Sequence, residues 1–222
     1  MKTSIRLFPL IFFALSLSFL TSCKKNLIIG SGAIITETRN VSDFYNVAAY
    51  ANTEVKINYG TAYKVEVKGY ESLVPHLNTF VENGTLFVRF NKNVNVQDED
   101  VDVRITMPQL KSISVYENGE AELLSAFPNM DNLKVLSSDR AEIDLKAGSA
   151  NLLKAELSGS GKIKGFGLLA KKVQAEMIGS GKIEVSVSDN LNVNIDGSGT
   201  VYYKGNPELY TQITGAGQVI KK

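Results

Sequence analysis

Side chains that could act as nucleophiles are few in this chain of 222 residues. Ser160, Ser180 and Ser198 each stand between two glycines, so each could be held in a tight turn. A serine nucleophile needs a neighbouring base, and His76 is the single histidine of the sequence. The Gly-x-Ser-x-Gly pattern of a strained nucleophile turn is also missing from the sequence. We therefore expect the three serines to be structural and His76 to lie on a surface turn.

Carboxylates are the other side chains that could do chemistry. The densest acidic group is Asp98, Glu99, Asp100 and Asp102, but it lacks the glycine-containing loop of a calcium site, so we expect a solvated loop. A second set follows in the C-terminal half: Glu142, Asp144, Glu156, Glu176 and Glu184. Two such carboxylates could flank a sugar bond, which leaves a polysaccharide-processing enzyme as one alternative. Lysines are interleaved with them, which is typical of a solvated face that resists strand aggregation.

Two stretches, Gly159–Lys162 and Gly179–Lys182, are similar to the end of a phosphate-binding loop. Ile163 and Ile183 stand where that loop needs Ser or Thr to bind magnesium. A strand is expected to follow each stretch, so no helix N-terminus would face an anion. One cysteine and one histidine are also too few for a zinc site built from these ligands. We therefore expect no metal and no cofactor.

The N-terminus has the features of a secretory signal. Lys2 and Arg6 precede an apolar run of 14 residues, from Leu7 to Leu20, which would span about 21 Å as a helix against about 30 Å of hydrocarbon. A run this short is typical of a signal peptide rather than of a membrane span. The end of this segment, Leu-Thr-Ser-Cys, is similar to the bacterial lipobox, which implies that Cys23 becomes the acylated first residue of the mature protein.

These features predict the domain organisation and the location. Residues 1–22 would be a lipoprotein signal, residues 23–31 a tether, and residues 32–222 a single domain. The membrane is the expected partner of Cys23, and no acidic run of the kind that directs lipoproteins to the cell surface follows it. The periplasmic face of the outer membrane is therefore favoured. The net charge is +1 with both signs interspersed, so nucleic acid is not an expected partner.

The C-terminal half repeats with a period of about 20 residues. The repeat is anchored at Gly119, Asp139, Gly161, Gly181, Gly199 and Gly217. Four residues before the anchors stand Val115, Val135, Leu157, Met177, Ile195 and Ile213, and two residues after them stand Ala121, Ala141, Ile163, Ile183, Val201 and Val219. Alternation inside each segment indicates strands with one buried face, and the longer period indicates coils that stack on one another. The prediction is an all-β fold, a right-handed parallel β-helix (β-solenoid) with about six short coils, the handedness following from the rule for parallel crossovers.

The N-terminal half is β-rich and less regular. Alternating residues predict strands at residues 54–59, 63–68 and 101–107. Asn83–Gly84 indicates a hairpin turn, residues 71–78 could form one helical turn, and residues 91–100 are expected to be a loop. No linker separates the two halves.

Three tyrosines are candidates for a binding surface. Tyr202 follows the inward Val201, so it should point outward, and Tyr210 and Tyr116 could be its neighbours. Exposed rings of this kind could stack on sugars or on a protein partner. The alternative is that they are scattered surface tyrosines without a function.

Taken together, several segments resemble the head GIN domain family of auto-transporter adhesins. The resemblance is carried by the Gly-Ser-Gly coils, by the strand Val101–Met107 with the Pro-Gln-Leu that follows it, and by the segment Asn83–Leu86. It spans about residues 34–222 and implies a β-helical domain on envelope lipoproteins, with no catalytic residues to transfer to this chain.

The sequence therefore predicts a lipid-anchored, non-catalytic envelope protein that acts as an adhesin or as a binding module for a glycan or an envelope protein. A polysaccharide-processing β-helix enzyme is one alternative. A structural module that self-assembles into a homo-oligomer is the other, because the open strand edges at the end of a solenoid must be capped or paired.

Overall fold

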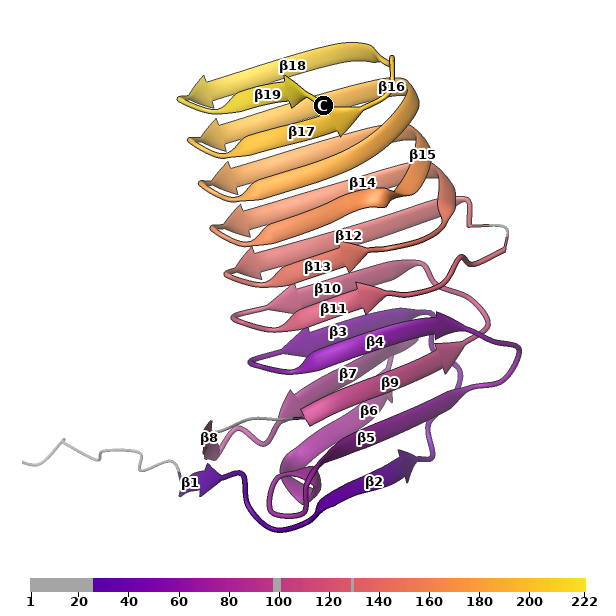
Figure 1. Ribbon diagram of the computed structural model, residues 1–222, viewed down its shortest axis with the longest axis vertical. Helices are drawn as coiled ribbons and strands as arrows, with labels where there is room; N and C mark the ends of the chain where they lie inside the picture. The colour runs from indigo at the N-terminus through magenta and orange to yellow at the C-terminus, as the bar shows by residue number, and fades with distance from the viewer. Residues whose placement is uncertain (1–25, 98–100, 129) are drawn as a thin grey trace, which may run out of the picture.

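The structure is a computed structural model that describes residues 26–97, 101–128 and 130–222. The predicted signal peptide and Cys23 lie outside the described residues, as do Asp98, Glu99 and Asp100 of the acidic group. The described chain is mostly strand, and its only helical element is the short 3-10 turn η1 (Val74–His76). It folds into an elongated β-solenoid of about five turns, close to the six coils expected, which confirms the predicted fold class (Figure 1).

Each coil contributes one strand to each of two parallel sheets. Sheet I contains β3 (Asn46–Tyr50), β10 (Ser112–Tyr116), β12 (Asn132–Asp139), β14 (Ser149–Gly159), the second parts of β15 (Lys162–Gly179) and β16 (Lys182–Gly197), and β18 (Glu208–Gly215). Sheet II contains β4 (Glu54–Tyr59), β11 (Glu120–Leu123), β13 (Glu142–Leu145), the first parts of β15 and β16, β17 (Thr200–Lys204) and β19 (Gln218–Lys221). The chain passes from sheet I through a sharp corner into sheet II, so the coils stack along the long axis of the molecule (Figure 1).

The N-terminal end of the solenoid is closed by antiparallel strands. Sheet II continues from β4 to β9 (Val101–Met107), β5 (Lys64–Tyr70) and β2 (Ile34–Arg39). Sheet I continues from β3 to β7 (Thr85–Phe90) and β6 (Leu77–Glu82), which are joined by the predicted hairpin turn. The strands β3 and β4 thus lie between β7 and β9 on one side and β10 and β11 on the other. The solenoid therefore begins at Asn46, well before the repeat that is visible in the sequence.

Two segments of the N-terminal half differ from the expectation. Asn26–Ile29, in the predicted tether, forms strand β1, and Val94–Gln97, in the predicted loop, forms strand β8. The two strands pair in parallel as a separate small sheet. Ile28 and Val96 from these strands pack against the core, which explains why these two short segments become strands here. The predicted helical turn is confirmed as η1.

The corners fix the register of the coils. Asp139 pairs with Gly159, and Gly159 pairs with Gly179. All three residues have positive φ angles, of 65°, 116° and 122°. Asp tolerates this left-handed backbone better than most residues, so it replaces the first glycine of the corner. The repeat predicted from the sequence treats Asp139 and Gly161 as equivalent anchors. The structure pairs Asp139 with Gly159, so the predicted register of this one coil is wrong by two residues.

The correct register changes one member of each inward column. In the second column Ile143, and not Ala141, lies between Ala121 and Ile163. Ser137, and not Val135, lies beside Leu157, while Val135 lies beside Ala155. All of these side chains are buried, so the predicted dry interior is present with a different partner at this level. The Ser137 hydroxyl donates a 2.8 Å hydrogen bond to the carbonyl of Ala141. This bond satisfies the one buried hydroxyl of the column.

The buried side chains that stack from coil to coil, which we call the interior ladder, lead to a prediction for Ile183. This side chain is fully buried and pairs with Ile163 on one side and Val201 on the other. Replacing Ile183 with alanine should lower the free energy of unfolding by about 3 kcal/mol, because the coils on both sides limit collapse around the cavity. Urea denaturation measures the change. Ile178→Ala, at a side chain that is 63% exposed, should stay within about 0.5 kcal/mol of the parent, and equal losses for the two variants would contradict the ladder.

The last coil presents an open edge. Within the described part of the chain, the strand partner of β18 in sheet I is β16 alone, and every residue of β18 is exposed. Leu209, Tyr210 and Ile213 are among its exposed side chains. An edge of this kind can template pairing with another strand, so it is compatible with the predicted homo-oligomer, which stays a prediction.

Candidate binding surfaces

The structure does not bring the three predicted tyrosines together. Tyr116 ends β10 on the outer side of sheet I, Tyr202 lies on β17 in sheet II, and Tyr210 lies on β18. Five strand steps of sheet I separate Tyr116 from Tyr210, which is about 24 Å at the usual spacing of about 4.8 Å. A single surface made of all three is therefore wrong.

Tyr202 and Tyr210 have local partners that occupy them. The Lys182 and Lys222 ammonium groups each lie 4.6 Å from the centroid of the Tyr202 ring. This ring is therefore already engaged in two cation–π contacts. The Tyr210 hydroxyl donates a hydrogen bond to the Glu208 carboxylate, which raises the pKa of Tyr210. Neither tyrosine belongs to a larger group of rings among the described contacts.

Tyr116, by contrast, belongs to a row of four stacked rings that we call the aromatic ladder: Phe80, Phe87, Tyr50 and Tyr116. The ring centroids of Tyr116 and Tyr50 are 4.5 Å apart with an interplanar angle of 14°. Tyr50 and Phe87 are 6.5 Å apart, and Phe87 and Phe80 are 5.2 Å apart. The four rings come from β10, β3, β7 and β6, and each is partly exposed on the outer side of sheet I.

Two charges influence the aromatic ladder. The Arg89 guanidinium lies 4.9 Å from the Phe80 centroid and covers that end of the row. Burial raises the pKa of Tyr50, and the neighbouring Tyr116 raises it further, so the Tyr50 hydroxyl stays protonated at neutral pH. The ladder is therefore an uncharged ring surface with hydroxyl groups at its Tyr50 and Tyr116 end.

A groove of about 440 Å³ continues from Tyr116 along the outer side of sheet I. Its lining includes Ser138, Glu156, Glu176 and Asp196, which supply hydroxyl and carboxylate groups. Glu156 is bound to Lys134 at 2.8 Å. The ladder and the groove together form one elongated surface of rings followed by hydrogen-bonding groups.

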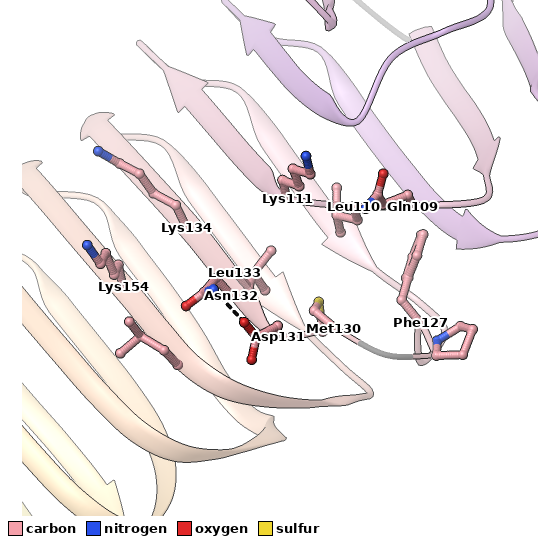
Figure 2. Close-up of a pocket in the computed structure, with 12 residues that line it drawn as sticks. Gln109, Leu110, Lys111, Phe127, Met130, Asp131, Asn132, Leu133, Lys134 and Lys154 are labelled. Carbon is pink, nitrogen blue, oxygen red and sulfur yellow. Dashed lines mark hydrogen bonds between the residues drawn. The ribbon is translucent and has the colours of Figure 1, made fainter.

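A second hollow, of about 720 Å³, lies where the connections into β10 and β12 meet sheet I (Figure 2). Apolar side chains of these connections, among them Phe127 and Met130, line one part of it. Lys111, Lys134 and Lys154 line another part. We call this hollow the lysine pocket.

Comparison with known proteins places this solenoid in a family. The family described as "putative auto-transporter adhesin, head GIN domain" matches residues 43–207. The chain belongs to this head GIN domain family. No curated protein matches the chain in sequence.

Solved head GIN-like structures share the fold. A putative adhesin from Bacteroides fragilis superposes with a TM-score of 0.72 at 22% identity and covers 88% of this chain and 100% of its own. A putative lipid binding protein from Parabacteroides distasonis gives a TM-score of 0.56 at 23% identity, with 89% and 100% covered. A putative adhesin from Parabacteroides merdae gives 0.53 at 20% identity, with 89% and 99% covered. At these identities the similarity establishes the architecture.

The five carboxylates considered for sugar chemistry are spread over both sheets of this head GIN domain. Glu156 and Glu176 face outward from sheet I, whereas Glu142, Asp144 and Glu184 face outward from sheet II. On sheet II, Glu142 binds Lys162 and Lys164, and Glu184 binds Lys182. Ion pairs thus engage Glu142, Glu156 and Glu184, and the structure does not gather all five acids at one site.

Asp144 lies among charged side chains on the outer side of sheet II. Burial raises the pKa of Asp144, and the nearby Lys146 and Lys164 oppose this effect without cancelling it. The neighbouring Glu122 and Glu142 carboxylates raise it further. We assign this shift to partial desolvation among these charged side chains.

The remaining candidates of the sequence have structural positions in the head GIN domain. Ser160, Ser180 and Ser198 are exposed at corners, and their backbone N–H groups donate to carbonyls of the preceding coil. His76 ends η1 on a half-exposed turn, as expected. No group of three or more His, Cys, Asp or Glu residues within the described ranges could hold a metal ion.

Proposed function

We propose that this head GIN domain protein is a lipid-anchored, non-catalytic envelope protein that binds a glycan along the outer side of sheet I. The anchor rests on Cys23 and the signal-like segment before it, and the adhesin family supports an envelope or surface role. No helix of the described residues is long and apolar enough to cross a membrane. The observation that carries the binding proposal is the aromatic ladder with the groove beside it.

The ladder suits a sugar chain for a physical reason. Sugars have apolar C–H faces that stack on aromatic rings and hydroxyl groups that need hydrogen-bond partners. Tyr116 ends the row and borders the groove, so its face that is turned away from Tyr50 supplies such a surface, and the stacked rings of Tyr50 and Phe87 support it from behind. Glu176, Asp196 and Ser138 supply acceptors in the groove that follows. An extended chain could thus lie along the solenoid with stacking at one end and hydrogen bonding at the other.

A binding measurement on Tyr116 tests this proposal. A glycan array identifies a ligand, and its dissociation constant is then compared between the parent and Tyr116→Ala. We expect about tenfold weaker binding, because the variant removes a stacking ring worth about 1.4 kcal/mol and the support of Tyr50.

Tyr210→Ala is the matched control, since this tyrosine is exposed on the same sheet but lies outside the ladder. It should bind as the parent does. A broad glycan panel without a ligand, or equal losses for the two tyrosine variants, would overturn the proposal.

A further inference from the structure

The lysine pocket has the size of a small-molecule site. Its volume of about 720 Å³ lies inside the usual range of about 300–1,000 Å³ for ligand pockets. It is formed by residues 109–111 between β9 and β10, by the described residues 127–128 and 130–131 before β12, by the first residues of β12, and by Leu152 and Lys154 of β14. It is separate from the aromatic ladder, because no ring of the ladder lines it.

The pocket is polarised from end to end. Figure 2 shows Phe127 and Met130 at one end, and Lys134 and Lys154 extending side by side at the other. Lys134 and Lys154 are register partners on β12 and β14, so their backbones are one strand spacing apart, about 4.8 Å. The Phe127 ring is held in place by an edge-on contact with Tyr59 at 5.6 Å. The apolar end of the pocket is therefore packed against β4 through Phe127 and Tyr59.

The charges of the pocket are only partly compensated. Lys134 binds Glu156 at 2.8 Å, and the Lys111 ammonium lies 4.3 Å from the Tyr45 ring centroid. Within residues 26–97, 101–128 and 130–222, the Lys154 side chain forms no ion pair and no hydrogen bond. The ammonium of Lys154 is thus the charge most available to a ligand.

The one acid of the lining is already engaged. The Asp131 carboxylate accepts hydrogen bonds from the side-chain amides of Asn132 at 2.9 Å and Asn151 at 2.7 Å. Figure 2 shows Asp131 beside Asn132 and Met130, apart from the amino groups of Lys134 and Lys154. A ligand of negative charge would therefore meet the lysines first.

We propose that the lysine pocket binds a small amphipathic anion, a short acyl or aryl body with a carboxylate or phosphate head. The head contacts Lys154, with Lys134 beside it, and the body lies against Phe127 and Met130. A head without a body would lose the apolar contacts, and a body with a cationic head would face repulsion from the lysines. This inference does not depend on glycan binding, because it uses a different surface.

The test uses the mature chain, residues 23–222, with Cys23→Ser so that no acyl group competes for the pocket. Decanoate and decyl phosphate are titrated by isothermal calorimetry and by NMR chemical shifts. Both should bind saturably with one site per chain, and their ratio reports whether a carboxylate or a phosphate head is preferred. Inorganic phosphate, which lacks the tail, and decyltrimethylammonium, which has the opposite charge, should bind at least tenfold more weakly.

Variants locate the site. Lys154→Glu should weaken decanoate binding about tenfold, and Leu152→Gln, at a half-buried lining residue, should weaken it about threefold. Lys92→Glu makes the same charge change on an exposed turn far from the pocket and should leave binding unchanged. Thermal unfolding confirms that each variant is folded. Absence of saturable binding, equal binding of the cationic probe, or no loss in Lys154→Glu would overturn the proposal.

Discussion

Replacing Gly179 with alanine is expected to lower the free energy of unfolding by about 3 kcal/mol or more. Gly179 forms the corner between sheet I and sheet II with a φ angle of 122°, a backbone region that L side chains rarely adopt. Its added Cβ would lie 2.4 Å from the carbonyl oxygen of Gly159 in the neighbouring coil. The cost combines about 1–2 kcal/mol of backbone strain with about 1–3 kcal/mol for forcing two coils apart.

Thermal and urea denaturation measure this loss. For a chain of this size a loss of about 3 kcal/mol corresponds to a fall of about 6–12 °C in the melting temperature. Ser180→Ala is the control at the same corner, because its side chain is exposed and only its backbone N–H bonds the neighbouring coil. That variant should keep the parent stability within about 0.5 kcal/mol. A Gly179→Ala protein as stable as Ser180→Ala would show that the coils do not stack as closely as described.

Replacing Cys23 with serine is expected to move nearly all of the protein from the membrane fraction to the soluble fraction. The proposed anchor consists of two or three acyl chains on Cys23, and each buried CH₂ group contributes about 0.8 kcal/mol to membrane binding. Serine cannot carry the thioether-linked lipid, so the variant loses the whole anchor. Fractionation with immunoblotting measures the distribution, and intact mass of the extracted parent protein should show a lipid-modified chain that starts at residue 23.

The basic residues after Cys23 provide the control for this experiment. Lys24 and Lys25 follow the anchor and could contact anionic headgroups on their own. Changing both to alanine should leave the protein membrane-bound if the lipid is the anchor. Release by the double alanine variant together with retention of Cys23→Ser would show that charge, and not acylation, holds the protein at the membrane.

The β-solenoid could be predicted from local patterns because each pattern reports a local physical constraint. Alternation of apolar and polar residues reports a strand with one buried face, and recurring glycines report corners with positive φ. These constraints were sufficient for the architecture and for the columns around Ile163 and Ile183. They failed at Asp139, where a residue other than glycine occupies the first corner position and a buried serine, Ser137, breaks the apolar column.

The amino-acid pattern alone is sufficient to specify stacked coils, and the N-terminal residues carry the features that predict an export signal and an acylated cysteine. Which outward side chains become neighbours follows from the folded arrangement of the strands. Tyr50 and Tyr116 stack although they are 66 residues apart, and Phe87, which lies between them in sequence, packs on the other side of Tyr50. Alternation along one strand specifies whether a side chain points in or out. Which strands lie side by side is determined by the packing of the whole core, because the strand order must minimise the free energy of all coils together. For that reason the aromatic ladder depends on the position of β3 between β7 and β10, and the two lysines of the lysine pocket are neighbours because β12 pairs with β14.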